Sequence, residues 1–332
     1  MKNNIFVKNY QSLLDVSDTQ LCIKLIKDTF ENLLSESLGL VRVTAPLFIE
    51  PTTGLNDELT GVETPVSFVP RNNPITLEIV QSLAKWKRYA LRKYGFDGIY
   101  TDMNAIRPFE DMDNLHSLYV DQWDWEKIIT PNERTIDYLK SVVNKIYFDL
   151  KETERIVTER FPIIPKELPD EITFITTEEL LQKYPNLTPK ERENAIVREK
   201  KAVFLMKIGH KLSNGEPHDK RASDYDDWNL NGDLLLYHKQ LDLAFEISSM
   251  GIRVNKDSLI EQLTLSNEVE KLNLAYHQAI IANTLPLTIG GGIGQSRLCM
   301  YFLKKVHIGE VQSSYWSEKE VDEFKKFNIN LL

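Results

Sequence analysis

The chain has 332 residues, of which 42% are hydrophobic and 27% are charged, and its formal net charge is −9. This composition supplies a large core and excludes bulk disorder, while the acidic balance argues against a long polyanionic partner such as tRNA or DNA. Two cysteines, Cys22 and Cys299, form neither a disulfide framework nor a zinc cluster. Both lie on apolar, helix-periodic stretches, so we expect buried, reduced thiols.

The N-terminal stretch MKNNIFVKNYQ lacks the apolar core of a signal peptide, and no run of eighteen apolar residues occurs. We therefore expect a cytoplasmic protein without a membrane partner. No internal repeat, low-complexity tract or long linker divides the chain, which predicts a single domain over residues 1–332.

Helix starts, helix stops and hydrophobic periodicity predict the elements of the first half of the chain. The SDTQ capping box (17–20) and Gly39 bound the first helix, and Ser82 and Gly95 bound the second. The expected helices cover 17–37, 82–94 and about 130–161. The expected strands cover 40–48, 75–80, 116–128 and a stretch that ends at Arg107.

In the second half, strands and helices alternate, and several strands are neighbours in sequence. We expect strands at 171–177, 202–208, 232–238, 241–248 and 287–292, and helices from Thr177, Thr188 and Gln295. The stretches within 232–248 read as a hairpin. Such neighbours favour an α+β fold with an antiparallel sheet flanked by helices over a doubly wound fold.

Lys87 lies inside the apolar stripe of the helix 82–94, whereas Lys85, Arg88 and Arg92 fall on the side expected to be wet. A lysine that points inward needs a carboxylate partner to keep its charge. Three interpretations stay open for Lys87: an internal salt bridge, an ammonium that extends past the apolar stripe to water, or a ligand for a substrate carboxylate.

A run of polar side chains occupies one face of the strand 116–128. Gln122, Asp124 and Glu126 share that face, and Trp123 and Trp125 take the other. Three adjacent polar groups are costly in a core. They either line a pocket or face solvent on an edge strand.

Asp233, Glu246 and Arg253 stand within a strongly apolar region. Each charge alone reads as a surface residue. Carboxylates on two adjacent strands, however, suit Mg²⁺, which takes few protein ligands together with phosphate oxygens. Asp233 and Glu246 are therefore a candidate metal site.

The glycine-rich stretch LTIGGGIGQSRLCM (287–300) matches neither the dinucleotide fingerprint nor the P-loop, because its glycine spacing differs and it has no lysine. The pattern that remains is Gly292, Gly294 and Arg297. Glycines allow close approach of an anion, and an arginine at a helix start suits phosphate. The alternative is a tight strand-to-helix turn with a surface arginine.

These segments resemble the signatures of class II aminoacyl-tRNA synthetases. LGLVRVTAPLF (38–48) is similar to the first signature, which builds a dimer interface. Arg107 with Glu110 resembles the second, although two residues rather than one separate them, and 292–297 resembles the third. Lys87, the Q-x-D-x-E strand and Glu246 with Arg253 are most similar to the aspartyl-tRNA synthetase catalytic domain.

The whole chain resembles the ammonia-dependent aspartate–ammonia ligases, the A-type asparagine synthetases, which share that core without a tRNA-binding domain. Five stretches carry this resemblance: LAKWKR (83–88), HSLYVDQWDWE (116–126), HDKRASDYDDW (218–228), FEISSMGIRV (245–254) and TIGGGIGQSR (288–297). Residues 131–212 would form an insertion in the single catalytic domain.

The resemblance implies ATP-dependent synthesis of L-asparagine from L-aspartate and ammonia by a homodimer with Mg²⁺. A β-aspartyl-adenylate would form and then react, releasing AMP and pyrophosphate. Lys87 and Arg253 would grip the reacting carboxylate, Arg107 the α-phosphate and Arg297 the far phosphates. We expect the pocket to be rich in fixed positive charge, because both reactants are anions.

The resemblance assigns residues to each role. The expected catalytic residues are Asp57, Lys87, Arg107, Gln122 and Arg297. The expected aspartate-binding residues are Asp57, Ser82, Lys87, Gln122, Asp124, Ser249 and Arg253. The expected ATP-binding residues are Arg107, Glu110, His116, Asp226, Asp233, Glu246, Ser248 and Arg297, with Asp233 and Glu246 as metal ligands.

The second step needs neutral ammonia, so a carboxylate must take a proton from ammonium. Asp57 is the first candidate, in a GLNDELTG loop (54–61) whose glycines allow closure, and Asp226 is the second. Glutamine is not the expected nitrogen source, because Lys2 rather than a nucleophilic cysteine follows Met1. Two other functions stay open: a tRNA-charging enzyme, and a non-catalytic paralogue that binds an amino acid or an adenylate.

Overall fold

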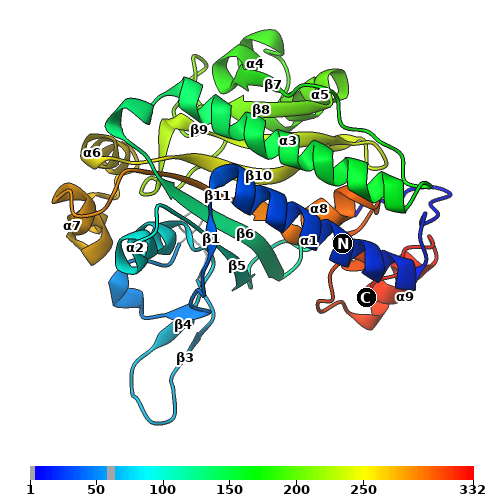
Figure 1. Ribbon diagram of the computed structural model, residues 1–332, viewed down its shortest axis with the longest axis horizontal. Coiled ribbons are helices and arrows are strands. Elements are labelled where there is room, and N and C mark those ends of the chain that lie inside the picture. The colour runs from blue at the N-terminus through cyan, green and yellow to red at the C-terminus, as the bar shows by residue number, and fades with distance from the viewer. Residues whose placement is uncertain (1–3, 58–63) are drawn as a thin grey trace.

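The computed structural model describes residues 4–57 and 64–332, and its centre is one large β-sheet (Figure 1). Most neighbouring strands run antiparallel, whereas the pair at each edge is parallel. This arrangement confirms the predicted α+β fold. In spatial order the strands are β1 (Val41–Arg42), β5 (Gly98–Ile106), β6 (Tyr119–Ile128), β11 (Thr288–Gly294), β10 (Leu243–Arg253), β9 (Asp226–His238), β8 (Ala202–Met206) and β7 (Thr173–Thr176).

One face of the sheet is covered by α1 (Val16–Leu38), α3 (Ile136–Arg160) and α8 (Gln295–Phe302) (Figure 1). α1 buries Cys22, Ile26 and Phe30 at four-residue spacing, which is a single stripe of an α-helix. The helix starts just before the predicted capping box, because the Asp15 side chain caps it. It ends at Gly39, whose φ of +68° is left-handed.

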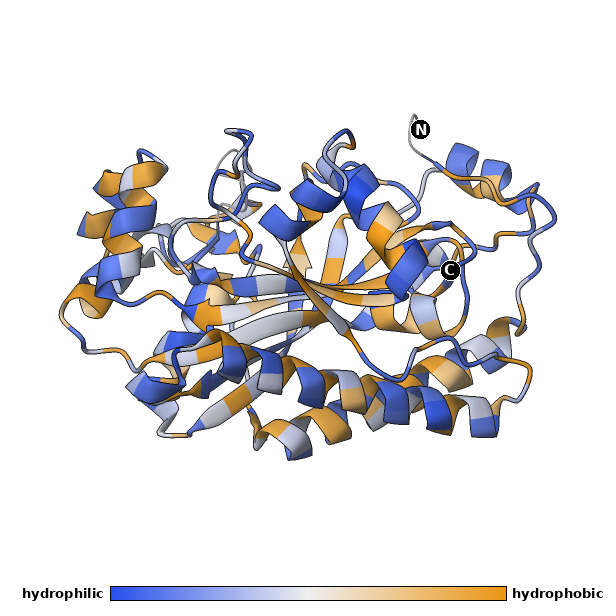
Figure 2. Ribbon diagram, turned by 90° about the horizontal axis from the view of Figure 1, so that it is seen from above, coloured by the Kyte–Doolittle hydropathy of each residue, from blue (hydrophilic) through white to orange (hydrophobic). Residues whose placement is uncertain are grey.

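Side chains alternate across the sheet and separate this core from the opposite face. Trp123 and Trp125 of β6 are fully buried against the helices, so Gln122, Asp124 and Glu126 point to the other side. β6 pairs with β5 and with β11, so the edge-strand interpretation of this segment is wrong. Figure 2 shows hydrophobic residues along the sheet and hydrophilic residues on the outer sides of the helices.

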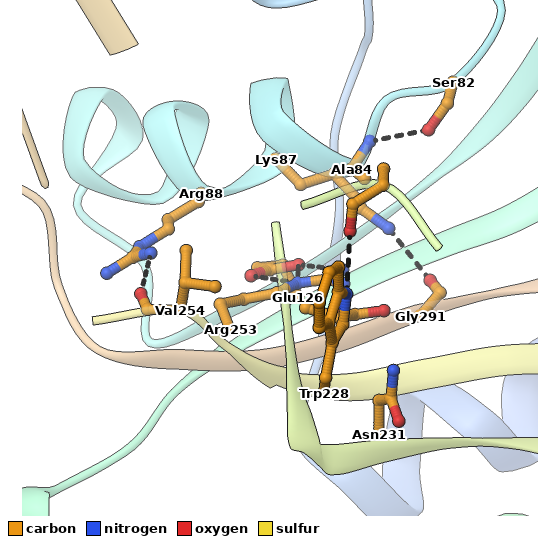
Figure 3. Close-up of polar contacts among 12 residues, drawn as sticks. Ser82, Ala84, Lys87, Arg88, Glu126, Trp228, Asn231, Arg253, Val254 and Gly291 are labelled. Carbon is orange, nitrogen blue, oxygen red and sulfur yellow. Dashed lines mark hydrogen bonds and ion pairs between the residues drawn. The ribbon is translucent and has the colours of Figure 1, made fainter. Parts of the chain in front are cut away.

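The opposite face near β5 is covered by α2 (Ala84–Tyr94), which packs Trp86 and Leu91 against Ile99 and Met103. The N-cap of α2 is Leu83, and the predicted cap Ser82 instead accepts a hydrogen bond from the Ala84 N–H at 3.1 Å (Figure 3). The helix therefore starts two residues later than predicted.

The prediction of a wet face on α2 is wrong for Lys85 and Arg88, which are both buried. Lys85 Nζ lies 2.9 Å from the Asp224 carboxylate. Arg88 donates to the carbonyl oxygen of Val254 (Figure 3) and to that of Pro286. The apolar stripe of the helix predicts only the face that packs on the sheet. Residues of the C-terminal half of the chain pack on another side of α2 and bury Lys85 and Arg88 there.

Two further predictions need correction. The predicted strand 40–48 is two short strands in two different sheets, β1 and β2 (Phe48–Ile49), with Pro46 between them. The capping box at Thr130 closes only a 3₁₀ turn, η2 (Pro131–Glu133), and α3 begins after a second cap at Thr135.

The other predicted helices and strands are present, with shifted ends. The hairpin β9–β10 is longer than predicted and places Asp226 opposite Arg253. The remaining elements are η1 (Pro51–Thr53), β3 (Ser67–Phe68), β4 (Leu77–Ile79), α4 (Thr177–Lys183), α5 (Pro189–Lys200), α6 (Lys256–Leu265), η3 (Val269–Asn273), α7 (Ala275–Ile281), η4 (Ile308–Glu310) and α9 (Glu318–Lys325).

Both cysteines are free and buried, as predicted. Within residues 4–57 and 64–332, no helix combines the length and the apolar character needed to cross a bilayer.

Asp149 of α3 is a buried carboxyl that accepts a hydrogen bond from Ser37 Oγ at 2.5 Å. Burial raises the pKa of Asp149 to about 6. Because this pKa is higher in the folded than in the unfolded chain, stability is lost as the pH rises from about 4 to about 6. We predict that Asp149→Asn, which keeps an acceptor for Ser37, raises the free energy of unfolding near neutral pH by about 2 kcal/mol.

Urea denaturation at about pH 4 and about pH 8 measures this effect, and the gain should appear only at the higher pH. An equal gain at both pH values would contradict the assignment to the carboxyl charge.

Candidate active site

Two adjoining cavities lie beside strands β6, β10 and β11. The Arg297 cavity, of about 200 Å³, is lined by residues of β6, β10, β11 and α8. The Lys87 cavity, of about 280 Å³, is lined by residues of α2, β6, β10 and the segment before β9. Arg107, Gln122, Glu246 and Gly292 line both. The two cavities therefore meet at these four residues.

The structure brings most predicted site residues to these two cavities. The predicted aspartate-binding residues that line the Lys87 cavity are Asp57, Ser82, Lys87, Gln122, Asp124, Ser249 and Arg253. The predicted ATP-binding residues that line the Arg297 cavity are Arg107, Glu110, His116, Glu246, Ser248 and Arg297.

Two predicted ATP-binding residues lie elsewhere. Asp226 lines the Lys87 cavity, where its carboxylate pairs with Arg253. Asp233 is buried on β9, where its carboxylate pairs with Arg221. Both residues lie on β9, where the strand register puts Asp226 opposite Arg253 and Asp233 opposite Ser249.

Lys87 is buried with 1% of its side chain exposed. Its ammonium group pairs with Asp124 of β6 and donates to the carbonyl oxygen of Gly291 at 2.9 Å (Figure 3). Burial lowers the pKa of Lys87, and the Asp124 carboxylate opposes this shift. Lys87 thus forms an internal salt bridge and also lines the cavity, so these two interpretations of the sequence do not exclude each other.

Arg253 at the end of β10 is held by two carboxylates. Its Nη2 lies 2.7 Å from Glu126 Oε2, its Nε donates to the same carboxylate, and its Nη1 pairs with Asp226 (Figure 3). The Tyr225 ring lies 5.8 Å from the guanidinium carbon. Burial raises the pKa of Asp226, although Arg253 opposes this shift. The guanidinium is thus fixed in orientation within the wall of the Lys87 cavity.

The glycine run is strand β11, as predicted for 287–292, and the strand continues to Gly294 directly before α8, without an intervening loop. Gly290, Gly292 and Gly294 belong to β11 and face Glu126, Asp124 and Gln122 across the ladder with β6. A Cβ at Gly290 would lie 2.0 Å from Glu126 Oε2, and one at Gly292 would lie 2.5 Å from Gln122 Oε1. These glycines leave room for the polar side chains of β6.

Two arginines approach the junction of the cavities from different elements. Arg107 follows β5 and donates to the Gln81 carbonyl at 3.2 Å. Arg297 lies in the first turn of α8, as predicted, and donates to the Glu246 carbonyl at 3.0 Å. Both line the Arg297 cavity. Arg107 lines the Lys87 cavity as well, whereas Arg297 does not.

Asp233 of β9 and Glu246 of β10 point to the same face of the sheet. Burial raises the pKa of Asp233 to about 7, although Arg221 opposes this shift. Asp233 Oδ1 is buried and has no hydrogen-bond partner within the described part of the chain. No cluster of three or more His, Cys, Asp or Glu side chains among those residues would hold a metal on protein ligands alone.

The Lys87 cavity is rich in fixed cations, as expected, but carboxylates balance them. In the Lys87 cavity the cations Lys87, Arg107, Lys220, Arg221 and Arg253 are matched by the carboxylates Asp57, Asp124, Asp219, Asp226 and Glu246. Buried cations need such partners, because an unpaired charge in a core is very costly. The cavity therefore presents both signs of charge, which suits a zwitterionic ligand.

Sequence reasoning missed roles for Arg221 and Tyr225, which line the Lys87 cavity, and for Glu126, which orients Arg253. Arg221 and Tyr225 stand in the stretch HDKRASDYDDW, so the dense charge of that segment was the available signal. The predicted loop 54–61 is described only to Asp57, and its remainder lies outside the described residues.

Comparison with known proteins identifies the family of the chain. The family model described as aspartate-ammonia ligase matches residues 17–328. The chain belongs to the aspartate–ammonia ligase family.

Family members of known name are similar along their whole length. The aspartate–ammonia ligase of Ruminiclostridium cellulolyticum is 55% identical over all of both chains. That of Fusobacterium nucleatum subsp. nucleatum is 56% identical over 97% of this chain and 99% of its own.

Solved structures show a shared fold with aminoacyl-tRNA synthetases. The asparaginyl-tRNA synthetase of Pyrococcus horikoshii complexed with asparaginyl-adenylate has a TM-score of 0.65 at 16% identity, over 89% of this chain and 68% of its own. The Entamoeba histolytica asparaginyl-tRNA synthetase in complex with asparaginyl-adenylate has a TM-score of 0.64 at 13% identity, over 90% of this chain and 66% of its own. The chain thus spans about two thirds of these synthetases.

The close approach at Gly290 yields a stability prediction. Gly290→Ala places a methyl group against Glu126 and Arg253 and should separate this buried pair. We expect a loss of about 3 kcal/mol or more in the free energy of unfolding, measured with urea. In a Glu126→Ala background the nearest clash is gone, but approaches of 2.6 Å to Arg253 Nη2 and to the Trp125 carbonyl oxygen remain, so the same change should still cost stability, although less than in the wild type.

Gly215→Ala is the control, because a Cβ there meets nothing within 4 Å and only the φ of +88° is strained. It should cost about 1 kcal/mol. Equal costs at Gly290 and Gly215 would contradict the steric explanation.

Proposed function

We propose that this chain makes L-asparagine from L-aspartate and ammonia, with ATP converted to AMP and pyrophosphate. The observation that carries this proposal is the junction of two cavities at Arg107. The Lys87 cavity takes the amino acid, and the Arg297 cavity takes the nucleotide. A carboxylate in the first then meets the α-phosphate of ATP in the second.

In the first step, an oxygen of the aspartate β-carboxylate attacks the α-phosphorus of ATP. The bond from that phosphorus to the bridging oxygen breaks, and pyrophosphate leaves with the electron pair. Arg107, at the junction, offsets the charge of the α-phosphate, and Arg297 binds the far phosphates. The product is β-aspartyl-adenylate.

Aspartate is recognised by both signs of charge in the Lys87 cavity. Lys87 and Arg253 bind its reacting carboxylate, and the carboxylates on the walls accept hydrogen bonds from its ammonium group. Asparagine carries a neutral amide, which leaves a cation of the site unsatisfied. The site therefore discriminates substrate from product through unpaired buried charge.

The residues around Asp233 fit a magnesium ion. Asp233 Oδ1 is a buried oxygen without a hydrogen-bond partner in the described chain, and Glu246 lies on the same face of the next strand. Two carboxylates with phosphate oxygens are what Mg²⁺ prefers in nucleotide sites. When bound, the ion supplies charge neutralisation for the phosphates.

In the second step, the nitrogen of ammonia attacks the β-carbonyl carbon of the adenylate. The bond from this carbon to the phosphate oxygen breaks, AMP leaves, and the nitrogen gives up a proton. Asp57 is buried and lines the Lys87 cavity, so its carboxylate is placed to take protons from ammonium before the attack and from the adduct after it. Asp226 lines the same cavity but is engaged by Arg253.

We also infer a cytoplasmic homodimer that acts as one catalytic domain without nucleic acid. Exposed apolar side chains lie on β1, β2 and β3 or next to them, and they supply a surface for a second copy: Val41, Leu47, Phe48, Phe68 and Val69. The net charge of −9 opposes RNA binding.

The reaction itself is tested with purified protein, ATP, Mg²⁺ and L-aspartate, supplied with either ammonium or glutamine. We expect AMP and asparagine with ammonium and none with glutamine. Formation of ADP instead of AMP, or product that requires tRNA, would overturn the proposal.

Asp57→Asn separates the two steps. If Asp57 takes the proton from ammonium, exchange of labelled pyrophosphate into ATP should persist within about threefold of wild type, while asparagine formation falls about 100-fold. Gln81→Ala, which removes the side chain that donates to the Asp57 carbonyl at 3.0 Å, is a comparison that disturbs the same loop but keeps the carboxylate. Equal loss of both steps in Asp57→Asn would remove Asp57 from the second step.

A further inference from the structure

We propose that Arg221 occupies the metal ligand Asp233 until nucleotide binds, and then moves to the phosphates as the ion takes its place. This inference rests on the proposed magnesium site at Asp233 and Glu246. It assigns to Arg221 two partners, a carboxylate in the empty enzyme and a phosphoryl oxygen in the loaded one.

The contact between Arg221 and Asp233 is close but incomplete. Arg221 Nη2 pairs with Asp233 Oδ2, and both side chains are largely buried, at 16% and 10% exposed. Arg221 Nε and Asp233 Oδ1 are buried, and neither has a hydrogen-bond partner in residues 4–57 and 64–332. The ion pair thus leaves one nitrogen of the guanidinium and one oxygen of the carboxylate without a hydrogen-bond partner.

The charges around this pair alternate in sign. Asp233 and Glu246 lie on the same face of neighbouring strands and repel each other. Arg221 pairs with Asp233, and Arg297 Nη1 lies 3.8 Å from the Glu246 carboxylate. A divalent cation between the carboxylates would replace Arg221 as their counterion, so arginine and metal compete for the same oxygens.

Arg221 has a second place to bind. It lines the Lys87 cavity, as do Arg107 and Glu246, two of the four residues at which the Lys87 and Arg297 cavities meet. It also borders a third cavity of about 600 Å³, which gives the side chain room to turn. The segment 207–225 that carries it has no helix or strand, and its single bridge joins Lys211 to Pro217.

The exchange preserves the electrostatic balance. When Mg²⁺ and ATP enter together, the ion neutralises Asp233 and releases a guanidinium next to a polyphosphate. A planar guanidinium binds two phosphoryl oxygens at once, and the metal-bound carboxylate no longer needs it. Arg221 would then stabilise the departing pyrophosphate. It is thus a catalytic residue that is bound to Asp233 in the empty enzyme.

Metal binding without nucleotide tests the competition. We expect Arg221→Gln to bind Mn²⁺ about tenfold more tightly than wild type, because the ion no longer displaces an arginine. Titration followed by the electron paramagnetic resonance of free Mn²⁺ measures this without turnover. Arg221→Lys keeps a cation on Asp233 and should bind Mn²⁺ like wild type. Arg221→Met serves in its place if the Gln variant does not fold, as judged by circular dichroism.

Arg134→Gln is the matched control, because Arg134 forms an equally buried ion pair with Asp227 on the same strand but lines neither the Arg297 nor the Lys87 cavity. Its Mn²⁺ affinity should equal that of wild type. A tighter affinity in Arg134→Gln as well would assign the effect to net charge and overturn the inference.

The second half of the exchange is tested with the non-hydrolysable analogue α,β-methylene-ATP and Mn²⁺. Here Arg221→Gln should bind the analogue about tenfold more weakly than wild type. The variant would then have a higher affinity for Mn²⁺ alone and a lower affinity for the nucleotide. Asp233→Asn separates the two proposals. If it leaves Mn²⁺ affinity unchanged, the metal site itself is wrong. If it weakens Mn²⁺ while Arg221→Gln changes nothing, only the competition is overturned.

Discussion

The site depends on two buried cations that strand β6 holds in place. Lys87 from α2 and Arg253 from β10 both reach the same strand, where Asp124 and Glu126 receive them. These charges are stable in the interior because each has its counterion within hydrogen-bonding distance. A helix, a hairpin and the central sheet are thereby joined at the floor of the Lys87 cavity.

The glycines of β11 result from that same constraint. Side chains on adjacent strands of one face compete for space, and the polar trio of β6 is long. Gly290 and Gly292 have no side chains, so Glu126 and Gln122 can lie across β11. The glycine pattern, which in the sequence suggested an anion-binding turn, therefore makes room in the structure for the polar side chains of β6.

The likeness to asparaginyl-tRNA synthetases shows a shared fold, and one fold can carry different functions. In the proposed reaction the amino acid occupies the Lys87 cavity and the nucleotide the Arg297 cavity, and the two cavities meet at Arg107. The fate of the activated carboxylate depends on which nucleophile can reach the acyl carbon. In the proposed reaction that nucleophile is ammonia, and the groups beside it are Asp57 and Asp226.

The sequence by itself determined the fold class, the face of β6 that carries Gln122, Asp124 and Glu126, and the inward position of Lys87, because these depend on local periodicity. The tertiary structure decided what periodicity does not contain: that Lys85 and Arg88 are covered from a second side, that Asp226 faces Arg253, and that Arg221 reaches Asp233. Such contacts join residues far apart in the chain, and strand register and packing, not spacing, set which charges meet.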